Sequence, residues 1–245
     1  MKLSVVIPAY NEAKSLPETI TQISQALKEH KITNEILVIN DNSSDNTVDI
    51  LNSLKKEVDT LRFITNDGPN GFGYAIRKGL ENFTGDIVAI MMADLSDSTS
   101  DLVAFYNTLI TEKVDAVFGS RFIKGGKTID YPPLKKMMNR LANSIIRLLF
   151  RIKYNDTTNA FKMYKKETIE GLKPFLAPHF NLTIELPLKV IIRGYSYTVL
   201  PNLWKNRKYG KSNLKIREMG SRYFFILLYC LIEKYFSKGD FVKKW

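Results

Sequence analysis

An α/β fold with a doubly wound, mostly parallel sheet is the architecture that three features of this sequence predict. Apolar, β-branched runs alternate along the chain with stretches in which apolar residues recur at helical spacing. The apolar runs are continuous, as in strands that are buried on both faces of a parallel sheet. The length of 245 residues suits one large domain with a full core, because two independent domains would both be small.

Strand and helix alternate regularly in the first half of the chain. Strands are expected at residues 3–7, 36–39, 61–65, 87–92 and 114–118. Helices are expected between them, at residues 16–27, 47–54, 74–83 and 102–110. This order predicts right-handed crossovers, helices on both faces of the sheet and a ligand beyond the carboxyl ends of the strands.

The second half of the chain is expected to be more helical and more basic. The expected elements are a basic helix at 134–151, an apolar stretch at 158–164, a helix near 182–192, a strand at 197–200, a basic loop at 205–211 and an apolar helix near 223–236. The domain is expected to span residues 1–212, followed by an amphipathic, basic helical extension at 213–245.

The apolar run at 223–232 has two interpretations. At ten residues it is only about half of the ~20 that a helix needs to cross a bilayer. Because arginines and lysines flank it, the run is suited to lie on an anionic membrane surface. It is equally suited to a buried helix that closes the core or an oligomer interface, since aromatic residues occur in both settings.

The net charge of +11, from 36 Lys and Arg against 25 Asp and Glu, favours anionic partners. Acidic lipid headgroups and phosphorylated small molecules fit this charge. Nucleic acid is not expected, because the sequence contains no recognition-helix, aromatic-stacking or zinc motif.

The single cysteine, Cys230, excludes an intrachain disulfide and fits a reducing compartment. The first apolar run is too short for a secretory signal. A cytoplasmic protein is therefore expected, either free or attached to the inner face of the plasma membrane.

Polar residues directly follow the expected strands, where a doubly wound sheet binds its ligand. The first strand runs into Pro8-Ala9-Tyr10-Asn11-Glu12, which lacks the glycine-rich turn of a dinucleotide-binding fold. Asp41 follows the second strand and can accept hydrogen bonds from a base or ribose, whereas Ser44 and Asp45 are expected to cap the next helix. Gly71-Phe72-Gly73 matches only part of a phosphate-binding fingerprint and is expected to form a turn.

Two carboxylates follow the fourth expected strand. Asp94 is the better candidate to hold a divalent cation that bridges the two phosphates of a nucleoside diphosphate, because such ions prefer oxygen ligands and neutralise a leaving diphosphate. Asp97 is a candidate for the same role or for the N-terminal cap of the next helix.

The order of these segments resembles family-2 glycosyltransferases. The segments that carry the resemblance are Val5-Val6-Ile7-Pro8-Ala9-Tyr10-Asn11-Glu12, Asn40-Asp41-Asn42-Ser43-Ser44-Asp45, Gly71-Phe72-Gly73-Tyr74-Ala75-Ile76-Arg77-Lys78-Gly79 and Met92-Ala93-Asp94-Leu95. Downstream, the segments 119–122, 156–164 and 207–212, together with Glu185, resemble the dolichol-phosphate mannose synthase branch and its bacterial polyprenyl-phosphate relatives.

The resemblance implies a GT-A fold, dependence on Mg²⁺ or Mn²⁺, and inverting transfer of a sugar from a UDP- or GDP-sugar to a polyprenyl phosphate. The nucleotide-binding residues that it implies are Pro8, Tyr10, Glu12, Asp41, Lys78 and Asp94. The metal ligands that it implies are Asp94 and Ser96, and the catalytic residues are Asp94, Arg121, Glu185, Arg207 and Lys211. Arg121 would meet the acceptor phosphate, and Arg207 with Lys211 the donor diphosphate or the acceptor phosphate.

The sequence also departs from the family pattern. Met92 stands where the family usually has an aspartate, Ser96 replaces a frequent glutamine, and Asn213 replaces a lysine. The weakened metal site leaves a non-catalytic nucleotide-sugar-binding protein as one alternative.

A second alternative is transfer to a saccharide in surface-polysaccharide synthesis. A lipid phosphate is already a nucleophile, so positioning and charge stabilisation would suffice. A sugar hydroxyl needs a base, for which Glu185 is the candidate, with a structural helix acid as the other interpretation.

Overall fold

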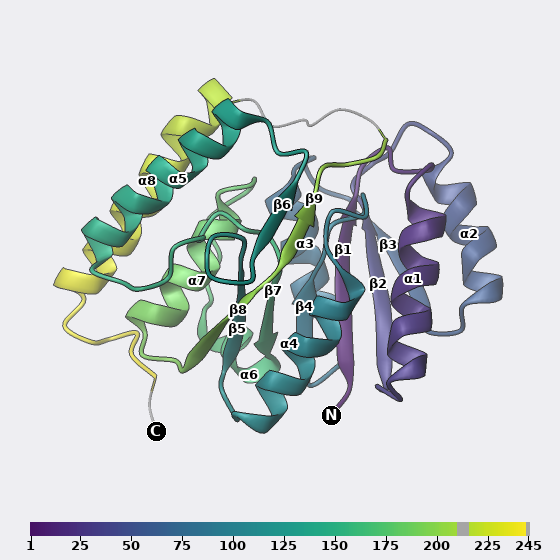
Figure 1. The fold of residues 1–245 in the computed structure, drawn as a ribbon, viewed down its shortest axis with the longest axis horizontal. Helices are drawn as coiled ribbons and strands as arrows, with labels where there is room; N and C mark the ends of the chain where they lie inside the picture. Colours follow the sequence, from purple (N-terminus) through teal and green to yellow (C-terminus); the bar gives the residue numbers. More distant parts are fainter. Residues whose placement is uncertain (210–215, 244–245) are drawn as a thin grey trace.

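The computed structural model describes residues 1–209 and 216–243, with the side chains of the last helix described from residue 220. Its centre is a seven-stranded sheet in the order β3-β2-β1-β4-β7-β5-β8, with helices on both faces (Figure 1). The strands of this sheet are β1 (Leu3–Ala9), β2 (Asn34–Asn40), β3 (Leu61–Thr65), β4 (Ile87–Ile90), β5 (Ala116–Ser120), β7 (Lys162–Lys165) and β8 (Tyr197–Pro201). A small second sheet pairs β6 (Lys127–Ile129) with β9 (Leu203–Lys205).

Helices bury the two faces of the sheet in separate cores. One core contains residues of α1 (Leu16–Glu29), α2 (Thr47–Glu57) and α4 (Thr99–Thr111). The other contains residues of α3 (Phe72–Asn82), α5 (Pro133–Phe150), α6 (Lys166–Gly171), α7 (Leu182–Ile192) and α8 (Ile216–Phe236). Successive residues of β1 and β2 point into opposite cores, which explains why their apolar runs are continuous.

The predicted doubly wound, mostly parallel sheet is confirmed, with one antiparallel strand. β1 is parallel to both β2 and β4, and β5 is parallel to β8, but β7 lies antiparallel between β4 and β5. The chain order reverses at β1, because β2 lies on one side of it and β4 on the other. In doubly wound sheets, ligands bind beyond the carboxyl ends of the strands at such a switch point. These ends lie at the upper edge of the sheet in Figure 1.

Several element boundaries differ from the expectation. β4 ends at Ile90 rather than at 92, and the Met92 N–H donates to the Asp97 carboxylate (3.1 Å). α8 begins at Ile216, before the expected residue 223. β6, β9 and α6 were not predicted, because segments of three to six residues are too short to show a hydrophobic period.

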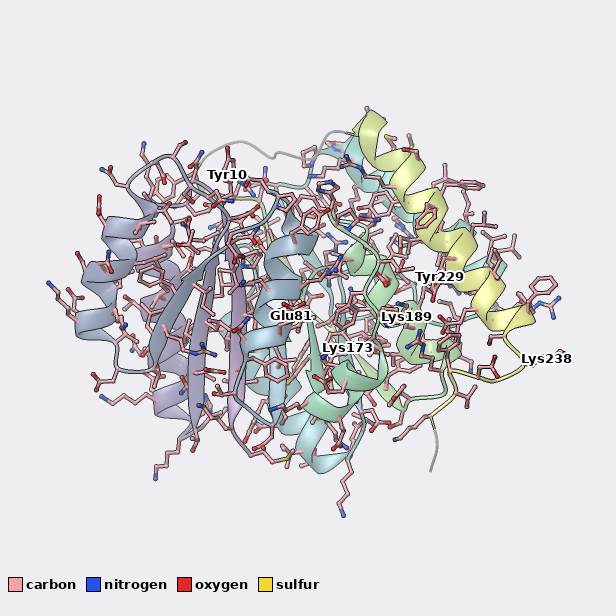
Figure 2. All side chains as sticks on the ribbon, turned by 180° about the vertical axis from the view of Figure 1, so that it is seen from behind. Tyr10, Glu81, Lys173, Lys189, Tyr229 and Lys238 are labelled. Carbon is pink, nitrogen blue, oxygen red and sulfur yellow. The ribbon has the colours of Figure 1, made fainter. Side chains whose placement is uncertain are left out.

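α8 is fixed to the domain by its inner side. Ile226 and Cys230 are fully buried in the core that α7 shares, and Arg193 after α7 makes a two-pronged ion pair with Glu233 (2.6 and 2.8 Å). Lys189 lies against the ring of Tyr229, 5.3 Å from its centroid (Figure 2). The predicted boundary between residues 212 and 213 lies outside the described residues. Within the described part of the chain, none of the helices combines the length and hydropathy needed to cross a membrane.

Glu35 at the start of β2 is expected to govern part of the acid stability. It accepts hydrogen bonds from the Ser4 hydroxyl and the Thr84 N–H and pairs with Arg62 (2.8 Å). Burial alone would raise the pKa of Glu35, but these partners lower it to about 2. A folded pKa below the unfolded value of 4.5 means that Glu35 stabilises the fold above pH 4.5, and this contribution disappears as the pH falls toward 2.

Replacing Glu35 by glutamine is therefore expected to lower the free energy of unfolding at neutral pH by about 1–2 kcal/mol. The full pKa shift would correspond to more, but Arg62 is partly exposed and screened by solvent. Urea denaturation across the acid range measures the effect, with the exposed Glu57→Gln as the control. If Glu35→Gln lost as much stability between pH 4.5 and 2 as the unsubstituted chain does, Glu35 would not be the source of this acid sensitivity.

Candidate active site

Three loops that follow β1, β2 and β3 are tied together at the carboxyl edge of the sheet. Asn11 and Asn42 both adopt left-handed backbone conformations (φ 55°), which asparagine tolerates well. The Asn11 Oδ1 accepts hydrogen bonds from the N–H groups of Ser44 (2.8 Å) and Asp45 (3.3 Å), and the Asn42 Nδ2 donates to Asn70 (2.7 Å). The three loops therefore form one fixed rim around the switch point.

The two residues expected to cap α2 have different roles. Asp45 accepts a hydrogen bond from the Thr47 N–H (3.0 Å), but it stands one residue before the N-cap of α2, which is Asn46, so the prediction that it is the cap is wrong. Ser44 does not cap the helix: its N–H and hydroxyl both donate to Asn11. Its function is to join the first two loops.

Asp41 connects the rim to α3. Its oxygens accept hydrogen bonds from the Asn66 side chain (2.8 Å) and the Gly71 N–H (2.7 Å), and burial raises its pKa. The expected turn at Gly71 to Gly73 is wrong in part, because α3 already begins at residue 72. Gly73 is needed for packing: a Cβ there would lie 2.5 Å from the Ala177 carbonyl oxygen.

The other expected nucleotide-binding residues differ in position and in solvent exposure. Pro8 lies within β1 opposite Ile39, whereas Tyr10 is 41% exposed just beyond the end of the strand, at the upper edge of Figure 2. Lys78 projects from α3 and pairs with the exposed Asp67 (2.8 Å). Among these side chains Tyr10 is the most open to a ligand.

Glu12, Asp94 and Arg207 meet at the switch point, from the loops that follow β1, β4 and β9. One Arg207 nitrogen lies 2.7 Å from Asp94 and the other 3.6 Å from Glu12. Burial raises the pKa of Glu12, although a hydrogen bond from Ser15 (2.6 Å) and the charge of Arg207 oppose this shift. The structure thus brings together three residues that are distant in sequence and were all expected in the site. Lys211 lies outside the described residues.

Asp94 and Ser96 offer oxygen atoms that fit a hard divalent cation. Asp94 is only 6% exposed, and its second oxygen accepts a hydrogen bond from the Ser96 N–H (3.2 Å). The Ser96 hydroxyl is buried and finds no hydrogen-bond partner among the described residues. The described residues contain no group of three His, Cys, Asp or Glu side chains that could hold a metal. An ion at Asp94 would therefore take its other ligands from water and substrate phosphates, as Mg²⁺ commonly does.

Asp97 is not the cap of α4. The N-cap position belongs to Ser98, and the Asp97 carboxylate instead accepts the Met92 N–H. Burial, helped by the negative charge of Asp94, raises the pKa of Asp97 to about 7. This side chain shapes the turn that presents Asp94.

Arg121 is held inside the protein by Asp156. The Arg121 Nε and Nη2 donate to both Asp156 oxygens (2.8 and 2.7 Å), and the Arg121 N–H donates to the same carboxylate (2.9 Å). The guanidinium also lies over the rings of Phe122 and Tyr131. This pairing organises the loop after β5, so an acceptor phosphate would have to share Arg121 with Asp156.

Lys135 is a site residue that the sequence did not reveal. It lies half-buried in the first turn of α5. Burial lowers its pKa, the nearby charges of Arg207 and Arg121 lower it further, and Asp94 opposes them. Lys135 therefore belongs to the same charge cluster. In the sequence, Lys135 is one of many basic residues in an amphipathic helix. Pro132-Pro133 could have marked it, because proline is typical of the first turn of a helix and Lys135 lies in that turn.

Glu185 has the contacts of a structural acid, the second of its two interpretations. It is fully buried, accepts the N–H groups of Leu176 (2.8 Å) and Ala177 (2.7 Å), and pairs with Lys189 (2.6 Å). These contacts hold the 176–177 segment, next to the residues against which α3 packs. They occupy the oxygens that a catalytic base would need.

Glu185→Ala is expected to lower the free energy of unfolding by about 3–5 kcal/mol, because Lys189 would be left as an unpaired buried charge. The double variant Glu185→Gln with Lys189→Met removes both charges and keeps an amide to accept the two N–H groups, so most of the stability and turnover should remain. Thermal denaturation and turnover are measured together. A double variant that is stable but inactive would indicate that Glu185 is a catalytic base.

Residues 4–172 match the family model of Glycosyl transferase family 2. The chain is a member of glycosyltransferase family 2. It is 30% identical over 219 residues to a dolichol-phosphate mannosyltransferase of Pyrococcus furiosus, with 88% of this chain and 60% of that protein covered. It is 27% identical to an undecaprenyl-phosphate mannosyltransferase of Micrococcus luteus, with 87% and 88% covered. It is 26% identical to glycosyltransferase AglD of Haloferax volcanii and spans only 36% of that protein.

The predicted GT-A fold of this family 2 glycosyltransferase is confirmed by solved structures. Glucosyl-3-phosphoglycerate synthase from Mycobacterium tuberculosis superposes with a TM-score of 0.71 at 18% identity, covering 95% of this chain and 79% of the other. That enzyme has been crystallised with Mn²⁺, UDP and glucosyl-3-phosphoglycerate. At this identity the likeness shows the shared fold.

Proposed function

We propose that this family 2 glycosyltransferase moves a sugar from a nucleoside diphosphate donor to a polyprenyl phosphate, with inversion at the anomeric carbon. The observation that carries the proposal is the convergence of Asp94, Glu12 and Arg207 at the switch point. The charges of Asp94 and Arg207 also act on the pKa of Lys135. The names of the Pyrococcus and Micrococcus relatives support a lipid phosphate as the acceptor.

The donor would bind across the rim, with its nucleoside against Pro8, Tyr10 and Asp41, and with Lys78 at the side of α3. Asp94 and Ser96 would hold Mg²⁺ or Mn²⁺, and Mn²⁺ in the solved relative supports this choice. When bound, the ion would neutralise charge on the leaving diphosphate. Asp94 would hold the cation that faces that diphosphate, and Arg207, 2.7 Å from Asp94, would stabilise the negative charge as the bond to the sugar breaks.

The acceptor phosphate would lie near Lys135 and Arg121. One of its oxygens attacks the anomeric carbon from the face opposite the diphosphate, and the glycosidic bond to the diphosphate breaks. The phosphate is already ionised, so this reaction needs no strong base. The structural contacts of Glu185, which occupy its carboxylate oxygens, are consistent with a reaction that uses no base. The proposed setting is the cytoplasmic face of the membrane, in cell-envelope polysaccharide synthesis.

Release of nucleoside diphosphate from a panel of UDP- and GDP-sugars tests the proposal. Each donor is incubated with Mg²⁺ or Mn²⁺, and with a polyprenyl phosphate, a saccharide acceptor or no acceptor. We expect release from one donor that depends on both the metal and the lipid phosphate. Release that requires the saccharide would select transfer to a saccharide, and nucleotide binding without release under any condition would select the non-catalytic alternative.

A further inference from the structure

α5 carries an apolar stripe that its packing against the core does not use. The stripe consists of large side chains that are 41% to 79% exposed: Leu134, Met137, Met138, Leu141, Ile145, Leu148 and Leu149. At about 100° per residue these positions fall within a sector roughly 120° wide. The buried Asn143, Ile146 and Phe150 lie on the opposite side of the helix. The stripe therefore faces away from the core.

α8 repeats this arrangement. Its large apolar side chains that are 44% to 77% exposed are Phe224, Phe225, Leu228, Ile232, Tyr235 and Phe236. The residues that attach it to the domain, Ile226, Cys230 and Glu233, are buried on the other side of the helix. The expectation that this helix closes the core thus accounts for one of its sides only.

The two stripes belong to neighbouring helices. α5 and α8 run side by side at one end of the molecule, opposite the end that α1 and α2 occupy (Figure 1). The inner residues of both helices share one core, and the Lys234 ammonium donates a hydrogen bond to the Phe150 carbonyl at the end of α5. We call the thirteen exposed residues of the two stripes the two-helix face. Exposed large apolar side chains gathered on two packed helices are more than the singly scattered ones of an ordinary surface, and they mark an interaction site.

Positive charge lies along one side of the two-helix face. Arg140 and Arg147 are exposed on one flank of α5, and Arg151 directly follows this helix. Lys238 is exposed beyond the end of α8, two residues before the exposed Asp240 (Figure 2). The sequence from 133 to 153 contains no Asp or Glu. Among the described side chains of α8 the acid is Glu233, which is buried against Arg193. An apolar surface with a basic flank complements a surface of acyl chains and anionic headgroups.

The two-helix face begins at the edge of the candidate active site. Leu134 opens the stripe of α5, and its neighbour Lys135 belongs to the charge cluster of Asp94 and Arg207. A surface bound to the two-helix face would therefore lie next to the place proposed for the acceptor phosphate.

We propose that the two-helix face binds the surface of an anionic lipid bilayer, with the apolar stripes among the upper acyl chains and the basic flank at the headgroup phosphates. A second copy of the chain is the less suitable occupant, because the basic flanks of two α5 helices would face each other and residues 133–153 contain no acid to offset them. Binding to the bilayer requires neither donor nor metal. Its test is thus separate from the test of sugar transfer.

Sedimentation of the full chain with vesicles, without donor or metal, tests this inference. We expect strong binding to vesicles that contain phosphatidylglycerol and weak binding to pure phosphatidylcholine. Replacing Leu141, Leu148, Phe224 and Phe236 together by glutamine should weaken binding at least about tenfold, because four apolar side chains no longer enter the interface.

A matched pair of variants tests the basic flank. Arg140→Gln with Arg147→Gln removes two charges from this flank and should weaken binding to phosphatidylglycerol vesicles about tenfold or more. Lys55→Gln with Lys56→Gln removes two exposed charges from α2, at the other end of the molecule, and should change binding little. Circular dichroism confirms that each variant is folded.

Two results would overturn the inference. One is equal binding of the unsubstituted chain and the four-glutamine variant to both kinds of vesicle. The other is a dimer in light scattering that separates in the four-glutamine variant, with no vesicle binding by either protein. The second result would assign the two-helix face to a second copy of the chain.

Discussion

Replacing Asp94 by alanine is expected to lower the rate of sugar transfer at least about a thousandfold, the largest effect of any single substitution in this site. Asp94 is buried at the switch point, where its carboxylate faces Arg207 (2.7 Å) and the nearby Ser96 presents a hydroxyl that has no hydrogen-bond partner in the described part of the chain. In the proposed function, the donor diphosphate would lose its ion together with this carboxylate. The fold should survive, because Arg207 retains Glu12 as a partner.

Two measurements separate this effect from simple unfolding. Thermal denaturation should be nearly unchanged in Asp94→Ala, while electron paramagnetic resonance should show that Mn²⁺ binding is lost. Asp59→Ala, which removes an exposed carboxylate from a loop before β3, serves as the control and should retain turnover. Normal metal-dependent turnover in Asp94→Ala would show that Asp94 is not a metal ligand.

Arg207→Ala is expected to change two properties in opposite directions. Turnover should fall about a hundred- to a thousandfold, because a cation that stabilises the leaving diphosphate is removed. Mn²⁺ affinity of the donor-free protein should rise about three- to tenfold, since Arg207 occupies one Asp94 oxygen and its charge opposes a cation there. A residue with a merely structural function would not strengthen metal binding.

Lys208→Ala is the matched control for Arg207. Lys208 is the next residue in the chain, and its pair with Glu18 is exposed to solvent (3.4 Å). Its loss should leave both turnover and Mn²⁺ affinity nearly unchanged. If Arg207→Ala weakened Mn²⁺ binding, the competition between Arg207 and the metal for Asp94 would be refuted.

The sheet could be predicted because its strands carry their own signal. β1 and β2 are buried on both faces, so each contains a continuous apolar run, at 5–7 and at 36–39, that is visible in the sequence. The position of β7 could not be predicted in this way. It pairs antiparallel with β4 and β5, far away in the chain, and nothing in its four residues specifies those partners.

The candidate site could be predicted where residues follow strands. Glu12, Asp41 and Asp94 all stand just beyond a strand that points to the same edge, and the fold brings these strand ends together. The partners of Arg121 and Glu185 could not be predicted, because Asp156 reaches Arg121 across 35 positions and the backbone groups around Glu185 depend on the path of a loop. Lys135 was missed because its function depends on where α5 begins relative to the β4 turn.

Transfer of a radiolabelled sugar into the organic phase tests the central claim most directly. The chain is given the donor that the panel identifies, with either a polyprenyl phosphate or the matching polyprenol, which lacks only the phosphate. We predict that label enters the organic phase with the polyprenyl phosphate, that the polyprenol accepts none, and that Asp94→Ala abolishes the transfer. Equal labelling of the polyprenol, or release of nucleoside diphosphate with no label in either lipid, would contradict a lipid phosphate as the acceptor.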